Sequence, residues 1–111
     1  MEKNTDLIFK ALAHSGRRRL LDRLREDNGQ TLAGLTRHLD MTRQAVTKHL
    51  ALLEAANLVI PVKRGREKWH YLNPAPIAEI YDRWIGKYER HRVQALTDLK
   101  NALQEDQHDQ A

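Results

Sequence analysis

The spacing of hydrophobic positions predicts four short helices in the first part of the chain. Leucine, isoleucine, valine and alanine recur there at intervals of three or four residues, so that in each segment they share one helical face. Charged and polar residues fill the remaining positions, a pattern typical of helices that cover a common core. The four predicted helices span residues 6–14, 15–27, 31–39 and 42–56.

Hydroxyl and amide residues mark where these helices begin and end. Ser15, Thr31 and Thr42 are each expected to be an N-cap, because a short side-chain oxygen can accept a hydrogen bond from a free backbone N–H of the first turn. Asn57 follows the fourth helix, and asparagine tolerates the left-handed conformation that often ends a helix. Only Asp40 and Met41 separate the third and fourth predicted helices, so these two helices are predicted to be joined by a tight turn.

A β-rich stretch follows the fourth helix. Residues 58–64 and 68–72 flank Gly65 and predict a hairpin. Pro61 has no N–H to donate to a neighbouring strand, so its strand is expected at an edge. Two short helices, a tight turn and a hairpin make a winged helix-turn-helix. The predicted fold is therefore mainly helical with a small β-hairpin, with four helices before the hairpin and one after it.

From Pro76 the apolar positions predict one long helix that runs to about Leu103. Residues 1–104 are predicted to form a single domain, and residues 105–111 a polar, frayed tail. The apolar stripe is too extensive for a lone surface helix, so we expect a homodimer in which a second copy covers it rather than burial within one chain. The candidate interface residues are Leu7, Ile8, Leu12, Ile80, Tyr81, Trp84, Tyr88, Leu96 and Leu99.

Basic charge is concentrated around the hairpin and the helix before it. The chain has 19 basic and 15 acidic side chains, and residues 41–72 contain six of the basic but only two of the acidic ones. The rest of the chain is therefore neutral as a group. A basic surface on a neutral body is expected of a protein that binds phosphate backbones, although charge alone fits an ordinary solvated surface equally well.

The fourth predicted helix carries side chains suited to the major groove of DNA. Arginine can pair with guanine, glutamine with adenine, and threonine with a thymine methyl or a phosphate. The basic residues beside Gly65 are expected to follow the DNA backbone or enter the minor groove. Two questions stay open: His49 and the Arg17–Arg19 cluster could each bind DNA or a group within the chain. The candidate DNA-binding residues are Thr42, Arg43, Gln44, Thr47, Lys48, His49, Arg64, Arg66 and Lys68.

The sequence offers little for catalysis, metals or membranes. It has no cysteine, which excludes disulfides, thiolate metal sites and cysteine nucleophiles, and it has neither a nucleophile elbow nor a phosphate-binding loop. Apart from His49, its histidines show no ligand spacing, so we expect His14, His38, His70, His91 and His108 to be structural or solvated. No apolar run approaches the roughly 18 residues of a membrane span, and the N-terminus lacks a signal-peptide core. We therefore expect a cytoplasmic protein with no enzyme activity, cofactor, metal site or membrane partner.

Three stretches resemble one family. ALAHSGRRRLLDRL, TLAGLTRHLDMTRQAVTKHLALLEAANLV and KRGREKWHYLNP are similar to the arsenic-repressor (ArsR) family of winged helix-turn-helix regulators, over about residues 7–74. The resemblance implies a repressor that dimerises through its last helix. The chain lacks the cysteine, aspartate and histidine ligand sets of the metal-sensing members. Asp40 and Asn57 stand where such proteins often have glycine, and both residue types can occupy left-handed positions.

The sequence as a whole predicts a DNA-binding transcriptional regulator. Its partner is expected to be double-stranded DNA with an inverted-repeat operator. The alternative function is a winged-helix module that binds another protein and recognises no specific DNA sequence. The inducing signal stays open, since a small apolar molecule, a partner protein or a change in protein concentration alone would each fit.

Overall fold

The computed structural model describes residues 2–86 and 90–109. The chain divides into two compact units, residues 1–80 and 81–111, and each is described on its own. Within the described ranges, no helix combines the length and the hydropathy that crossing a membrane requires.

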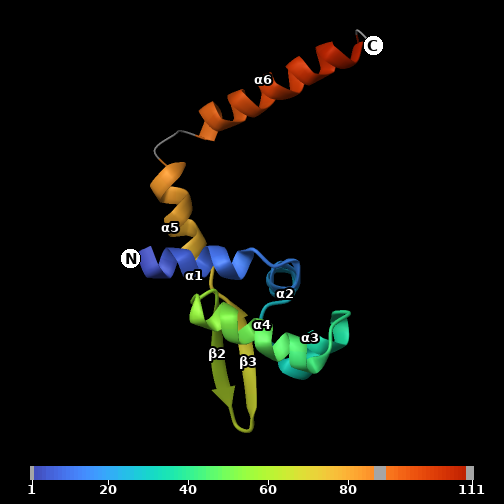
Figure 1. Cartoon of the computed structure of the whole chain (residues 1–111), viewed down its shortest axis with the longest axis vertical. Coiled ribbons are helices and arrows are strands. Elements are labelled where there is room, and N and C mark those ends of the chain that lie inside the picture. The colour runs from blue at the N-terminus through green and yellow to red at the C-terminus, as the bar shows by residue number, and fades with distance from the viewer. Residues whose placement is uncertain (1, 87–89, 110–111) are drawn as a thin grey trace. The chain divides into compact units, whose positions relative to one another are not determined.

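The first unit holds the helices and strands of a winged helix-turn-helix, which confirms the predicted fold class (Figure 1). Its helices are α1 (Glu2–Leu12), α2 (Ser15–Glu26), α3 (Leu32–His38) and α4 (Arg43–Ala55). Its strands are β1 (Gln30–Thr31), β2 (Val59–Arg64) and β3 (Glu67–Leu72). Two further helices follow: α5 (Ala75–Trp84), which contains the boundary between the units, and α6 (Arg90–Asp109).

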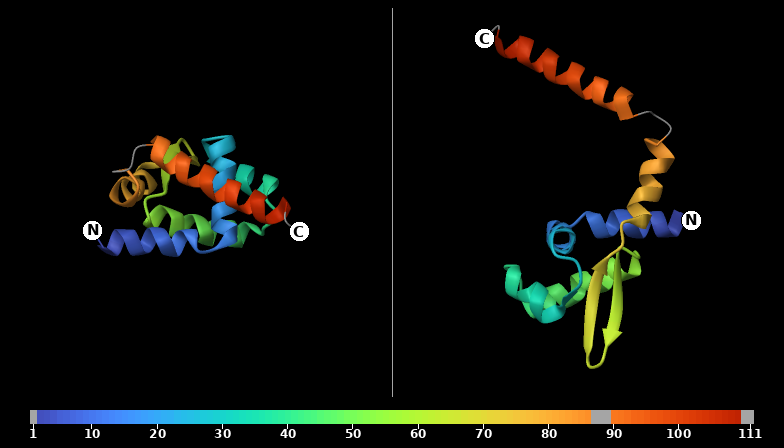
Figure 2. Two further views of the ribbon diagram at one scale, coloured as in Figure 1. Left: turned by 90° about the horizontal axis from the view of Figure 1, so that it is seen from above. Right: turned by 180° about the vertical axis from the view of Figure 1, so that it is seen from behind.

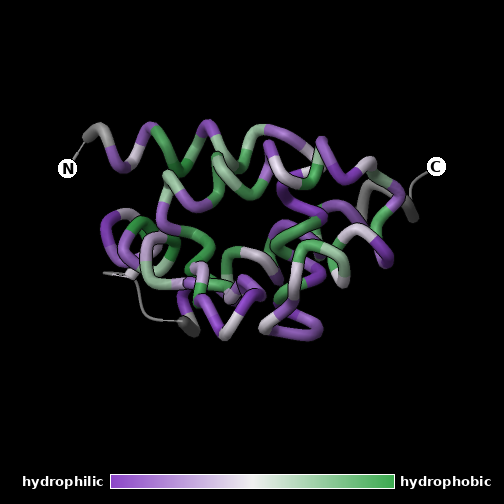
Figure 3. Tube along the Cα trace, turned by 90° about the horizontal axis from the view of Figure 1, so that it is seen from below, coloured by the Kyte–Doolittle hydropathy of each residue, from purple (hydrophilic) through white to green (hydrophobic). Residues whose placement is uncertain are grey.

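A cluster of aliphatic side chains forms the core of the first unit. Leu20 of α2, Leu35 of α3 and Leu53 of α4 are fully buried in it. Figure 3 shows hydrophobic positions interleaved with hydrophilic ones along α1, whose Ile8 and Ala11 join the same core. Burying one such leucine contributes roughly 1.5–3 kcal/mol relative to leaving it in water. This packing is what holds α4 in a defined place relative to α1, α2 and α3.

The three strands form an antiparallel sheet in the order β1-β3-β2. Pro61 lies on the outer strand β2, so its predicted edge position is confirmed. The hairpin of β2 and β3 extends past α4 in Figure 1 and in the right-hand view of Figure 2. Strand β1 was not predicted, because its two residues are too few to show an alternating pattern. It pairs with the middle of β3 and so fastens the base of the wing to the segment before α3.

The helix starts follow the predicted caps in two cases and differ in one. The hydroxyl oxygens of Thr31 and Thr42 each accept from the backbone N–H three residues ahead, at 3.1 Å in both, which confirms these caps. The prediction for Ser15 is wrong, because Ser15 is already the first helical residue of α2. The N-cap is His14, which has an extended backbone and whose Nδ1 accepts from the Gly16 N–H at 2.9 Å.

The two positions that were expected to be left-handed behave differently. Asn57 has a φ of 60°, which confirms the prediction that it ends α4 in this conformation. Asp40 does not share it, since among the described residues Asn57 is the only non-glycine residue with a positive φ. The turn between α3 and α4 is instead closed by a hydrogen bond from the Met41 N–H to the Leu39 carbonyl at 2.9 Å.

The prediction of one long helix after the hairpin is wrong. Helix α5 ends at Trp84, and the N–H groups of Gly86 and of the residue before it both donate to the Tyr81 carbonyl, at 2.9 and 2.8 Å. Glycine costs about 1 kcal/mol relative to alanine inside a helix, so Gly86 favours an end there. Helix α6 then runs to Asp109, past the predicted end at Leu103 and into the predicted tail. Apolar spacing continues on both sides of the break and conceals it.

Candidate DNA-binding site

The first two turns of α4 present polar side chains to solvent. Arg43, Gln44, Thr47 and Lys48 are exposed, while Val46 between them is fully buried. Residues spaced by one and four positions share a helix face, so burial of the apolar stripe forces these four side chains outward together. The structure thus places the predicted reading residues of α4 on one exposed face.

The two threonines of this region use their hydroxyl groups in opposite ways. Thr42 Oγ1 accepts from a backbone N–H as the N-cap, so its own hydrogen is free to donate to another group. Thr47 Oγ1 donates to the Arg43 carbonyl at 2.9 Å, so its hydrogen is used inside the helix. The outward-facing group that Thr47 can still offer is its methyl, together with a hydroxyl oxygen that only accepts.

The wing turns at Gly65, which has a φ of 61°. Arg64, just before the turn, lies over the rings of Trp69 and Tyr71, with its guanidinium carbon 5.9 and 5.8 Å from the ring centroids. Trp69 and Tyr71 are half-buried on this outer face of the wing. Arg66 is exposed at the turn, and in the described part of the chain it has no ion pair. Unlike Arg64, which lies over aromatic rings, and Lys68, which pairs with Glu54, Arg66 therefore has no aromatic or carboxylate partner in the described part of the chain.

Glu54 connects the wing to α4. Its Oε1 lies 3.1 Å from Lys68 Nζ and 3.7 Å from His70 Nε2. His70 is buried, and its Nδ1 lies 3.0 Å from the Gln30 carbonyl, an acceptor, so Nδ1 must carry the proton. Sequence reasoning missed Glu54, although an acid within a basic stretch was a usable signal.

Within the described ranges, no three histidine, aspartate or glutamate side chains gather so as to hold a metal ion.

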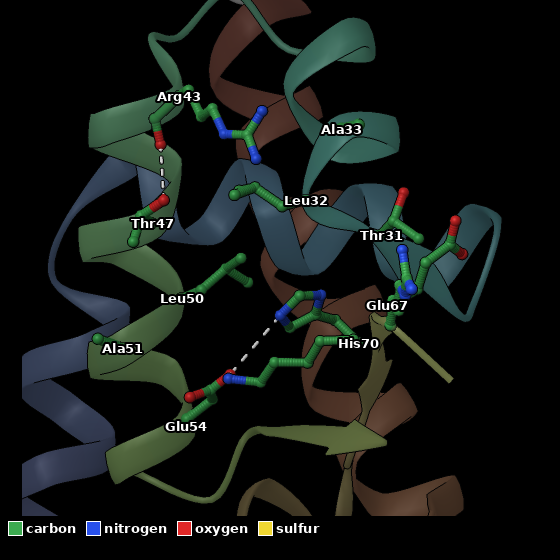
Figure 4. A pocket seen from close by; sticks show the side chains of 12 residues that line it. Thr31, Leu32, Ala33, Arg43, Thr47, Leu50, Ala51, Glu54, Glu67 and His70 are labelled. Atoms are coloured by element: carbon green, nitrogen blue, oxygen red, sulfur yellow. Dashed lines mark hydrogen bonds and ion pairs between the residues drawn. The ribbon is translucent and has the colours of Figure 1, made fainter. Parts of the chain in front are cut away.

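A groove of about 520 Å³ lies between α3, α4 and β3. Figure 4 shows Leu50 directed into it from α4, with the Arg43 side chain extended from α4 towards Leu32 of α3. Thr47 and Arg66 also line the groove. The groove therefore joins the exposed face of α4 to the base and turn of the wing, and three cationic side chains, those of Arg43, Arg66 and Lys68, lie along it.

His49 is directed into its own chain. It is half-buried, its Nδ1 lies 3.4 Å from an Nη atom of Arg17, and its ring centroid lies 4.6 Å from that of His14. Burial lowers the pKa of His49 below its ordinary value, and the nearby His14 and Arg17 lower that pKa further. Between the two readings left open for His49, the structure favours contact within the chain.

Two arginines of the cluster at the start of α2, Arg17 and Arg18, also have partners within the chain. Arg17 donates to the carbonyl oxygens of Ala11 at 2.8 Å and Lys10 at 3.1 Å, and Arg18 donates to that of Leu12 at 2.6 Å. The last carbonyls of a helix lack partners within it, and positive charge there also complements the helix dipole. These arginines therefore close the C-terminal end of α1, and no carboxylate is needed to explain them.

The predicted dimer-interface residues divide by exposure. Ile8 is only 5% exposed and belongs to the core of its own chain, so it has little surface left for a partner. Leu12 and Ile80 are partly buried against the same core. Tyr88 lies outside the described residues. The remaining five have exposed fractions between 37% and 66%: Leu7, Tyr81, Trp84, Leu96 and Leu99.

Comparison with known proteins shows the class of protein to which this chain is similar. A family model described as a helix-turn-helix domain matches residues 12–62. The HTH-type transcriptional regulator YuzN of Bacillus subtilis (strain 168) is 42% identical over 91 residues, which cover 77% of this chain and 99% of that protein. An HTH-type transcriptional regulator of Mycobacterium tuberculosis is 33% identical, over 70% of this chain and 72% of that protein. A solved ArsR-like transcriptional regulator from Rhodococcus sp. RHA1 is 31% identical with a TM-score of 0.68, over 88% of this chain and 93% of that chain.

Proposed function

Because the chain belongs to the ArsR family of DNA-binding helix-turn-helix transcriptional regulators, we propose that it is a homodimeric repressor that binds an inverted-repeat operator and acts in the cytoplasm. The observation that carries the proposal is the exposed polar face of α4 beside a groove with three cationic side chains. Repression follows if the bound dimer covers a promoter. The similar proteins are named transcriptional regulators, which supports a role in transcription, and the sequence carries no sign of a catalytic role.

The face of α4 is proposed to read bases in the major groove. Arg43 suits a bidentate contact with guanine and Gln44 one with adenine, and each such pair discriminates by about 1–3 kcal/mol. Lys48 suits a phosphate. Because the Thr47 hydroxyl hydrogen is used inside the helix, its proposed contact is the methyl group of a thymine. Thr42 keeps a free hydroxyl hydrogen and is proposed to donate to a phosphate.

The wing is proposed to hold the sugar-phosphate backbone that runs along the groove. Arg66 is the main candidate, because it is exposed at the turn and lines the groove. Arg64 and Lys68 are secondary contacts, since one stacks on aromatic rings and the other pairs with Glu54. His49 is assigned no DNA contact. Three cationic side chains line the groove against the two carboxylates of Glu54 and Glu67, and this excess of positive charge suits one DNA strand passing between the wing and α4.

The dimer is proposed to place two recognition helices about one helical turn apart on the DNA, roughly 34 Å. Exposed apolar side chains on α1, α5 and α6 support association, because so many large apolar groups are rarely left in water. An inverted repeat is then the operator form expected, since the two-fold axis of the dimer coincides with that of the DNA.

The proposal is tested by measuring binding of the full chain to a labelled duplex from the region upstream of its own gene and to random DNA, at several salt concentrations. Arg43→Ala and Gln44→Ala are expected to cost about 1–3 kcal/mol on the upstream DNA and much less on random DNA. Arg66→Ala is expected to weaken both and to flatten the salt slope by roughly one unit.

Arg25→Ala is the matched control, because it removes one exposed positive charge from α2 at a position outside the proposed site. It is expected to leave both affinities and the salt slope nearly unchanged. An Arg66→Ala slope equal to that of the wild type would contradict the role of the wing. Absence of salt-sensitive binding to any DNA would contradict the whole proposal and favour a winged-helix module that binds protein.

A further inference from the structure

The C-terminal end of α1 is fastened to α2, and the fastening side chain also reaches α4. Arg17 is 9% exposed, and its Nε and one Nη donate hydrogen bonds to carbonyl oxygens of α1. Its other Nη reaches His49 Nδ1. A guanidinium group has donors only, so Nδ1 must accept, and the proton of a neutral His49 ring then sits on Nε2. One buried arginine therefore joins α1, α2 and the recognition helix.

A second histidine and a glycine complete this contact. The ring of His14 packs on that of His49, while its Nδ1 serves as the N-cap acceptor of α2. Both rings lie over Gly16: a Cβ atom there would sit 2.9 Å from His49 Nε2 and 3.1 Å from two atoms of the His14 ring. The absence of a side chain at this position is what lets His49 approach the start of α2.

We propose that His49 is a positioning residue for DNA binding: with His14 and Arg17 it forms a clamp that holds α4 in its reading position, and acid opens the clamp and weakens DNA binding. The inference rests on the proposed DNA-binding function. His49 acts through Arg17 and the α1–α2 corner, and not by touching DNA. The clamp lies at the end of the second turn of α4, directly after the four exposed reading side chains, so a shift of His49 moves them as well.

The charges around His49 make the clamp sensitive to protonation. Arg17 from α2 and His14 from the turn before α2 face the ring, α1 contributes carbonyl oxygens that Arg17 already occupies, and the neighbour on α4 itself is Lys48. A proton on Nδ1 would turn the acceptor of the Arg17 hydrogen bond into a second donor. Protonation of His49 therefore breaks the contact and adds repulsion.

The direction of the pH effect follows from linkage. Burial, with His14 and Arg17, lowers the pKa of His49 in the folded chain below the ordinary 6.5. The neutral form is thus the one that folding favours, and the stability from the clamp is fully present above that ordinary pKa. It is lost as the pH falls from there through the lowered pKa.

Simple electrostatics predicts the opposite trend for DNA binding. Acid can only add positive charge to a protein, and added positive charge strengthens its attraction to phosphates. A fall in DNA affinity on acidification therefore points to the clamp and not to the general charge of the protein.

The experiment compares DNA affinity of the full chain at about pH 7.5 and about pH 5.5, with the upstream duplex as the probe. The wild-type affinity is expected to fall by about fivefold, the lower end of the usual range for coupled sites. His49→Asn places an amide oxygen where Nδ1 lies and cannot be protonated, so it is expected to lose the larger part of this fall. Adding His14→Asn, which keeps a cap acceptor, is expected to remove the rest.

His38→Asn is the control, since it removes an exposed histidine of α3 and is expected to keep the fall of the wild type. The inference is overturned if wild-type affinity stays level or rises on acidification, or if the affinity of the His49→Asn variant falls as steeply as that of the wild type.

Gly16→Ala tests the geometry of the clamp without a change of charge. Its new methyl would push the His49 ring, and the expected result is weaker DNA binding at about pH 7.5; wild-type affinity in this variant would count against the positioning role.

An NMR titration of the imidazole signals separates this inference from the proposed function. If the wild-type chain bound no DNA at about pH 7.5, the proposed function would fail, but the titration would still show whether the clamp lowers the pKa of His49. His49 is expected to titrate below the ordinary value of 6.5. A pKa of His49 at or above 6.5 would overturn the clamp whatever the DNA result.

Discussion

Two glycines with left-handed backbones differ in what surrounds them. Gly29, between α2 and β1, has a φ of 79°, and a Cβ atom there would lie 2.7 Å from a carbon of the Tyr71 ring. Gly65, at the turn of the wing, has a φ of 61° and nothing within 4 Å of the same position. The residues share one backbone requirement, and only Gly29 adds a packing requirement to it.

The pair gives a prediction for stability. Gly65→Ala is expected to lower the free energy of unfolding by about 1 kcal/mol, the cost of a left-handed alanine. Gly29→Ala is expected to cost at least about 1 kcal/mol more, because Tyr71 must also move away from its place over the turn. Urea unfolding followed by circular dichroism measures both. Equal losses in the two variants would show that the Tyr71 contact adds no constraint.

At the scale of elements, α4 shows how a hydrogen bond inside a helix decides what the helix can offer to DNA. Thr47 lies in the middle of the exposed face, and its hydroxyl group is turned back to the Arg43 carbonyl. The methyl group is then the part of the side chain available for an apolar contact. This assignment separates two substitutions that look equally conservative.

Thr47→Val keeps the methyl and the branched shape, so its affinity for the upstream duplex is expected to stay within about twofold of the wild type. Thr47→Ser keeps the hydroxyl and loses the methyl, so its affinity is expected to fall roughly fourfold, the equivalent of one buried methyl group at about 0.8 kcal/mol. Random DNA should not distinguish them. The reverse order, with Val the weaker binder, would show that the hydroxyl contacts a phosphate.

For the whole molecule, the second unit gives the clearest reason to expect assembly. Val93, Leu96, Leu99 and Leu103 recur along α6 at the spacing of one helix face, and their exposed fractions lie between 38% and 66%. A helix with such a stripe is stable in water when another surface covers it. A second copy of the chain is the partner proposed above.

Leu96→Glu is expected to shift the protein from dimer to monomer in sedimentation equilibrium at micromolar concentration, because a buried carboxylate without a partner is costly. The same variant should lose affinity for the upstream duplex, since a monomer contacts only one half-site whereas the dimer contacts two. Asn101→Glu introduces the same charge on α6 away from the stripe and should remain a dimer. A wild-type chain that sediments near 12.9 kDa would contradict the dimer itself.

Local patterns in the sequence were enough for the elements whose stability is local. Thr31 and Thr42 were predicted as caps because a cap needs only a hydroxyl group and the next few N–H groups. The buried stripe of α4 and the edge position of Pro61 followed in the same way from spacing and from a missing N–H. The exposed reading face of α4 could be predicted from the same spacing, because it is the side of the helix opposite the buried stripe.

Tertiary packing alone decided the remaining features. Glu54 was not predicted to tie the wing to α4, and His49 was left between two roles, because both depend on residues distant in the sequence: Lys68 and His70 for the first, Arg17 and His14 for the second. The break after Trp84 escaped prediction for the opposite reason, since a glycine's small local cost had to be weighed against an apolar pattern that runs through it. Sequence spacing determines which face of an element is apolar, whereas the partner of each polar side chain is determined only when the chain has folded.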